Sequence, residues 1–173
     1  MFSYIAAIIA GIATIVLDQI SKFYILSNFE LNDYRDFLPG LIDLTFIENG
    51  GGAWGMLSGY TWVLLLITAI VMVVCVAILI KIGFKNKLMF WSICLVLGGG
   101  IGNMIDRIFR DGKVVDFLHF TFWPQFPVFN IADIAIVIGA GLLILYYIKS
   151  MINDSKKAKK ANGNDELEKN EKD

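Results

Sequence analysis

The stretch VVDFLHFTFWPQFPVFNIADIAIVIG, residues 114–139, decides how the chain must be interpreted. It places two aspartates, Asp116 and Asp133, in sequence that is otherwise apolar and aromatic, with no lysine or arginine between them. An ionised carboxylate in membrane-like surroundings is costly, so it persists only where it has a partner or a function. A correct account of the fold must therefore explain what surrounds these two side chains.

The composition of the chain is typical of a membrane protein. Its 173 residues are 57% hydrophobic and 18% charged, whereas a soluble domain is about 45–50% apolar and about 25% charged. Crossing a bilayer takes roughly 20 apolar residues, and four stretches are long enough to be transmembrane helices: about 2–26, 59–80, 88–106 and 128–148. The sequence predicts an all-α membrane protein in which residues 1–150 form a single domain.

Other compositional features exclude some classes of protein. The first apolar run lacks a basic leader and a small-residue cleavage site, so we interpret it as a retained helix. Cys75 and Cys94 each lie inside an apolar helix, and we infer no disulfide. His119 is the single histidine, so no classical metal site is predicted. We expect no cofactor and no nucleic-acid partner.

The distribution of basic residues predicts the orientation in the membrane, because lysine and arginine gather on the cytoplasmic side. The 81–87 loop carries three lysines and the 149–173 tail carries seven, whereas the 18–58 segment has only Lys22 and Arg35 among six acids. Both termini and the 81–87 loop are therefore expected to be cytoplasmic. The polar 151–173 segment is predicted to be a disordered cytoplasmic tail.

The two longer connections are expected outside. In the first, about 27–58, LIDLTFI at 41–47 alternates Ile42, Leu44 and Phe46 with polar residues and favours β-structure. The second, about 107–127, ends in an aromatic-rich stretch. That stretch suits either an interfacial aromatic belt or a lid over a site, and the sequence leaves both interpretations open.

The two aspartates have three possible roles on the residues alone. They could form structural ion pairs, for example with Arg107 or Lys22. They could share one proton as a catalytic pair, because two close carboxylates cannot easily both ionise. They could also take part in ion conduction or a proton relay.

Several polar motifs are predicted to lie at the same depth as the aspartates. Asp18 and Lys22 are four residues apart near the outer end of the first helix, and Asn103 and Arg107 are four apart near the end of the third. Gly98 and Gly102 have the small-xxx-small spacing of tightly packed membrane helices. The residues expected at this level are Asp18, Lys22, Asn49, Asn103, Arg107, Asp116, Asn130 and Asp133.

Two alternative functions are less consistent with the sequence. Ser21 and Lys22 are adjacent on a helix and point about 100° apart, so they cannot form a Ser–Lys protease dyad. A small transporter or proton-relay protein would show internal repeats or a polar stripe through the membrane, whereas the polar residues here gather at one end.

Five motifs, taken together and in order, resemble those of the bacterial lipoprotein signal peptidases, the type II signal peptidases. They are DQISK (18–22), ENGGGAWG (48–55), GGGIGNMIDR (98–107), VVDF (114–117) and FNIAD (129–133). The resemblance covers residues 1 to about 150. It implies a membrane-embedded aspartic endopeptidase of the bacterial cytoplasmic membrane that removes signal peptides from prolipoproteins, cutting before a diacylglyceryl-modified cysteine near the outer face.

The resemblance also implies roles for individual residues. Asp116 and Asp133 would be the catalytic pair, and Asn103 and Arg107 would hold the substrate or inhibitor backbone. The residues that would support or shape the site are Asp18, Lys22, Asn49, Gly51, Asp106 and Asn130. The family further implies a small extracytoplasmic β-rich cradle between the first two helices, contact with membrane lipid, and inhibition by cyclic peptide antibiotics. We expect a monomer.

The sequence departs from the family pattern at one visible position. The asparagine loop of the family usually reads Asn-x-Gly-Ala-Ala-aromatic, and Gly52 stands here in place of the first alanine. A glycine at that position is expected to loosen the loop slightly without touching the aspartates.

Overall fold

The computed structural model describes residues 1–52, 56–57 and 59–170. Part of the ENGGGAWG motif, residues 53–55, lies outside the described residues. The elements along the chain are α1 (Phe2–Asn28), β1 (Tyr34–Leu38), β2 (Ile42–Asn49), α2 (Thr61–Ile82), the short 3-10 helix η2 (Gly83–Lys85), α3 (Lys87–Phe109), β3 (Val114–Phe120) and α4 (Ile131–Asn170).

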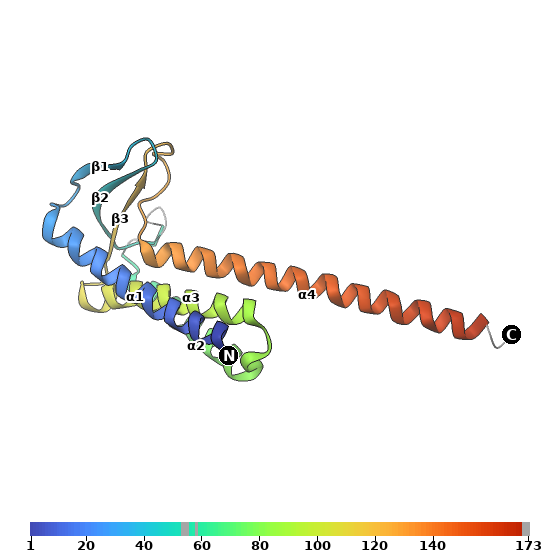
Figure 1. Ribbon diagram of the computed structural model, residues 1–173. Coiled ribbons are helices and arrows are strands. Elements are labelled where there is room, and N and C mark those ends of the chain that lie inside the picture. The colour runs from blue at the N-terminus through green and yellow to red at the C-terminus, as the bar shows by residue number, and fades with distance from the viewer. Residues whose placement is uncertain (53–55, 58, 171–173) are drawn as a thin grey trace.

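All four long helices are apolar and long enough to cross a membrane, which confirms the predicted architecture. The first three begin and end within three residues of the predicted bounds. The helix α3 is central: 56% of its most apolar membrane-length window is buried, against 6% for α2. It packs against both α1 and α4, and Figure 1 shows these three helices running side by side.

Glycines allow the helices to approach closely. A Cβ on Gly98 would lie 2.6 Å from the Gly11 carbonyl oxygen of α1, and one on Gly99 would lie 2.3 Å from the Ala132 carbonyl oxygen of α4. A Cβ on Gly102 would lie 2.7 Å from a carboxylate oxygen of Asp18. Since real side chains do not tolerate such distances, the predicted role of Gly98 and Gly102 in tight packing is confirmed.

A three-stranded antiparallel sheet in the order β1-β2-β3 covers one end of the bundle (Figure 1). The prediction placed the β-structure between the first two helices, but β3 comes from the α3–α4 connection, which was not predicted to contain a strand. In the β2–β3 register Ile47 is opposite Asp116. A cluster that includes Ile25, Phe46 and Val115 packs the sheet onto the end of α1.

The sheet also differs from the simple polar/apolar alternation expected over 41–47. Asp43 and Thr45 are buried rather than facing water. Burial of Asp43 is tolerated because its carboxylate accepts hydrogen bonds from the hydroxyls of Thr121, at 2.7 Å, and Tyr34. These bonds hold the pKa of Asp43 below its usual range, and the same bond raises the pKa of Tyr34 to about 12.

The last helix differs most from expectation. It begins at Ile131, three residues after the predicted start at about residue 128, so Asp133 lies in its first turn. It also continues to Asn170, well past the bundle (Figure 1), where the sequence predicted disorder from residue 151. The physical reason is that lysine, glutamate and alanine are good helix formers, and a helix already formed in the membrane extends without a new nucleus. The cytoplasmic location of this tail stays a prediction.

Candidate active site

A buried lysine anchors the polar residues at the sheet end of the bundle. The Lys22 ammonium group is fully buried and donates to three acceptors: Asp18 at 2.8 Å, Asp106 at 2.9 Å and the side-chain oxygen of Asn103 at 3.0 Å. An ammonium group has three N–H donors, so all of them are used. This arrangement joins α1 to α3 and leaves no spare donor on Lys22.

Both carboxylates beside Lys22 also bind backbone groups of other elements. Asp18 accepts from the Ala132 N–H at 3.0 Å, which holds the start of α4 against α1. Asp106 accepts from the Val115 N–H at 3.1 Å, which fixes β3 behind the end of α3. The Lys22 cluster therefore sets the positions of the two segments that carry Asp116 and Asp133.

The start of α4 forms a capping box that includes Asp133. The side-chain oxygen of Asn130 accepts from the Asp133 N–H at 2.9 Å, and one carboxylate oxygen of Asp133 accepts from the Asn130 N–H at 3.1 Å. This reciprocal pair satisfies backbone donors that a helix start leaves free. The other carboxylate oxygen of Asp133 accepts from the side-chain amide of Asn103 at 2.8 Å.

Two asparagine side chains hold Asp116 on β3. The Asn130 amide donates to one carboxylate oxygen at 2.6 Å, and the Asn49 amide donates to the other at 2.7 Å. The Gly51 N–H donates to the Asn49 side-chain oxygen at 2.9 Å, which fixes the orientation of that amide. Gly52 beside it has a φ of 69°. A glycine suits this left-handed conformation, so the departure from the family pattern fits the local backbone.

The electrostatic surroundings favour the protonated form of Asp116. Burial, with a smaller contribution from the charge of Asp133, raises its pKa to about 7. The hydrogen bonds from Asn49 and Asn130 act in the opposite direction without cancelling the effect. A carboxyl group with such a pKa exchanges a proton near neutral pH, as a general acid or base must.

Asp116 and Asp133 line one cavity of about 250 Å³ together with Asn49, Asn103 and Arg107. Within the described part of the chain, neither aspartate forms an ion pair within 4 Å. The structural ion pairs considered from the sequence are therefore not present, since Lys22 pairs with Asp18 and Asp106 instead.

Arg107 is positioned to donate a hydrogen bond to a molecule bound in this cavity. Its Nε is buried and has no hydrogen-bond partner among the described residues. The negative charges of Asp133, Asp116 and Asp106 all attract the Arg107 guanidinium group. A buried donor without an acceptor is costly, and an acceptor supplied by a bound molecule would remove that cost.

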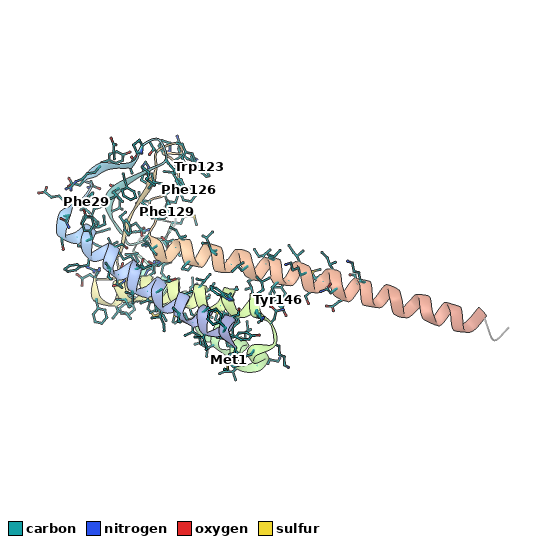
Figure 2. The ribbon with its side chains drawn as sticks, viewed as in Figure 1. Met1, Phe29, Trp123, Phe126, Phe129 and Tyr146 are labelled. Atoms are coloured by element: carbon teal, nitrogen blue, oxygen red, sulfur yellow. The ribbon has the colours of Figure 1, made fainter. Side chains whose placement is uncertain are left out.

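The aromatic segment before α4 forms one wall of the cavity. Phe126 and Phe129 line it, and their rings lie 5.8 Å apart, centroid to centroid. Figure 2 shows these two side chains together with Trp123 close to the start of α4. A second cavity of about 330 Å³ adjoins it along α4; it is lined by Asp133 and otherwise by phenylalanine and aliphatic side chains.

Most of the residues that the sequence predicted for the site belong to one connected network of hydrogen bonds and ion pairs. Hydrogen bonds link Asp18, Lys22, Asn49, Gly51, Asn103, Asp106, Asp116, Asn130 and Asp133, and Arg107 joins them at the cavity. The sequence reasoning missed Gln19, whose amide bridges Asp18 and Asp106 at 3.2 Å each. It also missed the capping box, although the Asn-x-x-Asp spacing at 130–133 was a signal for it.

Comparisons with known proteins agree on the family. A family model described as signal peptidase (SPase) II matches residues 10–149. The chain is 41% identical to the lipoprotein signal peptidase of Bacillus pumilus (strain SAFR-032) over 93% of this chain and 99% of that protein. It is 39% identical to the lipoprotein signal peptidase of Halalkalibacterium halodurans over 92% and 97%, respectively.

Solved structures agree with the fold. A structure described as a bacterial membrane enzyme has a TM-score of 0.80 at 34% identity and covers 86% of this chain and 90% of its own. A second, with the same description, has a TM-score of 0.76 at 34% identity. The chain therefore belongs to the signal peptidase II family and is an aspartic endopeptidase that removes the signal peptide from prolipoproteins during lipoprotein maturation.

Proposed function

We propose that Asp116 and Asp133 are the catalytic pair of this peptidase. The observation that carries the proposal is that both carboxylates face one cavity and are held by amides, with no ion pair among the described residues. Amide donors orient a carboxylate without neutralising its charge. The pair therefore stays available for proton transfer.

The reaction needs one proton shared by the pair. One aspartate takes a proton from water as the water attacks the carbonyl carbon, and the other gives its proton to the carbonyl oxygen. The resulting intermediate collapses when the first aspartate gives its new proton to the leaving nitrogen and the second takes a proton from a hydroxyl of the intermediate, so the carbonyl re-forms and the pair returns to its starting state. The raised pKa of Asp116, about 7, supports a pair that keeps one proton at neutral pH.

Arg107 and Asn103 are proposed to position the peptide. The unpartnered Nε of Arg107 points to a backbone carbonyl of the substrate as its acceptor. Asn103 has its side-chain oxygen occupied by Lys22 and Asn130, at 3.0 Å each, and its amide donates one N–H to Asp133 at 2.8 Å, so its second N–H is the group proposed to bind the peptide. Together they would hold an extended peptide across the two carboxylates.

The lipid of the substrate is proposed to occupy the apolar cavity along α4. That cavity of about 330 Å³ reaches Asp133 and is otherwise lined by side chains such as Phe129 and Val137. A diacylglyceryl group bound there would place the modified cysteine beside the pair while its acyl chains lie along α4. Binding would then require the lipid, because the apolar contacts supply much of the affinity.

We further propose that the sheet and the cavity face outward and that both termini are cytoplasmic. The lysine-rich 81–87 loop lies at the end of the bundle opposite the sheet (Figure 1), and basic loops stay inside. A cysteine introduced as Asp36→Cys should react with an impermeant thiol reagent added to intact cells, whereas Lys85→Cys should not. The reverse pattern would overturn the orientation.

The decisive experiment compares two substrates. The purified protein, acting as a monomer, should cleave a diacylglyceryl-modified prolipoprotein and leave the unlipidated precursor intact. Cyclic peptide antibiotics that inhibit the family should block the cleavage. Equal rates on both precursors would exclude lipid recognition by the apolar cavity, and no cleavage of either would exclude the proposed reaction. The alternative of a transporter is not favoured, since the comparisons indicate a peptidase.

A further inference from the structure

A third cavity, which is polar, lies at the end of the bundle opposite the sheet and shares no lining residue with the two cavities at the peptidase site. It has a volume of about 650 Å³ and lies between the start of α1, the η2 turn with the start of α3, and α4 near Tyr146. Figure 2 shows Tyr146 and Met1 at this end, away from Phe29 and Trp123. Because α1, α2 and α3 each begin or end here, the cavity is at the level where lipid headgroups meet the helices.

The walls of this cavity are held by specific contacts. The Tyr4 hydroxyl donates to the Phe84 carbonyl at 2.5 Å, and the Tyr4 ring packs edge-on against Phe84 and Phe90, with centroids 5.1 Å away in each case. Asn86 caps α3 by accepting from the Met89 N–H at 3.1 Å. These contacts tie the η2 turn to α1. The backbone that carries Lys85 and Lys87, on either side of Asn86, is therefore held in place.

The cavity is strongly basic, and its basic groups are uncommitted. Lys85, Lys87 and Lys149 line it from three different elements, and Asp154 is the single acidic residue in the lining. Among the residues that the structure describes, none of these three ammonium groups forms an ion pair, whereas Lys22 and Lys113 both do. Three like charges around one hollow repel one another, and an anion bound between them would remove that repulsion.

The location indicates where the anion comes from. Basic pockets between membrane helices at the cytoplasmic surface suit the phosphate of an anionic lipid headgroup. Tyr4, Tyr146 and Leu88 add apolar surface beside the lysines, which fits the glycerol region of a lipid. We propose that this cavity binds the phosphate headgroup of an anionic phospholipid in the leaflet opposite the sheet.

The test measures which lipid the purified protein retains. Native mass spectrometry is performed on protein extracted from nanodiscs that contain equal amounts of phosphatidylglycerol and phosphatidylcholine. The wild type should retain phosphatidylglycerol in preference to phosphatidylcholine. The variant Lys85→Gln with Lys149→Gln should retain at least about five-fold less of it, because two cationic contacts to one phosphate are lost.

The matched control is Lys81→Gln with Lys156→Gln, which removes the same charge from the same end of the protein without altering the cavity lining. This control should retain phosphatidylglycerol like the wild type. Equal loss in both variants, or equal retention in both, would overturn the proposal. Cleavage in neutral detergent should be unchanged in the cavity variant, which shows that it is folded.

A further arm separates a lipid from a soluble anion. Millimolar inorganic phosphate and glycerol phosphate are added before extraction. If they leave phosphatidylglycerol bound, the acyl chains contribute and the lipid assignment holds. If either one displaces the lipid and binds in its place, the cavity is a site for a soluble phosphate and the lipid assignment is wrong.

Discussion

The protein places two pairs of carboxylates in one connected network and surrounds them in opposite ways; Asp18, Asp106 and Asp116 are buried and Asp133 is partly buried. Asp18 and Asp106 share the ammonium group of Lys22 and bind backbone N–H groups of other elements. Asp116 and Asp133 receive hydrogen bonds from amides and face a cavity. A buried carboxylate paired with a cation serves the structure, whereas one that is oriented but not neutralised remains available for chemistry.

The largest effect should come from changing the cavity pair. Asp116→Asn and Asp133→Asn should each lower cleavage by about three orders of magnitude or more, because asparagine keeps the shape and cannot transfer the proton. The double variant should be little worse than either single one, since the pair acts as a unit. Cleavage of a lipidated prolipoprotein by purified variants measures this.

The matched control for this pair is Asp36→Asn, which changes an exposed aspartate on β1. It should cleave like the wild type. Activity above a few per cent of wild type in either cavity variant would falsify the catalytic assignment and return that aspartate to a structural role.

The Lys22 cluster should instead respond in stability. Lys22→Met leaves Asp18 and Asp106 buried without their cation and should cost about 3–5 kcal/mol of unfolding free energy. Replacing both carboxylates as well, with Asp18→Asn and Asp106→Asn, should restore part of that loss. Thermal unfolding in detergent provides the measurement. A single Lys22→Met variant that unfolds like the wild type would show that the cluster does not support the fold.

Arg107 tests whether the cavity aspartates are free of a structural cation. It lies at the same cavity as Asp116 and Asp133, yet it makes no ion pair among the described residues. Arg107→Ala should raise KM about tenfold with a smaller change in kcat, as expected for loss of a charged hydrogen bond to substrate. The melting temperature should change little. A large destabilisation that Asp116→Asn partly reverses would instead assign Arg107 to neutralising Asp116.

The smallest effect is a pH dependence of stability. In the folded protein the pKa of Asp116 is about 7, above its ordinary value of 3.8. The folded state therefore binds this proton more tightly, and the resulting stabilisation is complete below about pH 4 and is lost as the pH rises to about 7. The melting temperature of the wild type should fall between about pH 5 and pH 8 more steeply than that of Asp116→Asn. Equal slopes would contradict the raised pKa.

Much of this comparison could be predicted from the sequence, because membrane helices are decided by apolar length and polar residues within them are rare. The i, i+4 spacing of Asp18 and Lys22 correctly predicted that they lie on one helix face, and the structure shows their ion pair at 2.8 Å. The sequence could not predict that Asp106 is the second partner of Lys22. That contact depends on the glycine-mediated approach of α3 to α1.

The strand β3 could not be predicted from the sequence either. Val114–Phe120 is short and mostly apolar apart from Asp116 and His119, and its pairing with β2 depends on where α3 ends and not on a local pattern. Its first residues are buried on both faces, so the alternation that marks a half-exposed strand is absent. The position of Asp133 in the first turn of α4 follows from the Asn130 cap, a signal that was present in the sequence and not used.

The bond between the Asp18 carboxylate and the Ala132 N–H joins the first and last membrane helices, and this has a consequence for biosynthesis. Because the chain is made from its N-terminus, Asp18, Lys22 and Asp106 enter the membrane before α4 exists, and Asp133 follows only with that last helix. A nascent chain with three helices inserted therefore carries the structural anchor but only half of the proposed pair. With Asp116 and Asp133 as the proposed pair, proteolytic activity would begin only when insertion is finished, and a partly made enzyme would not cut the precursors around it.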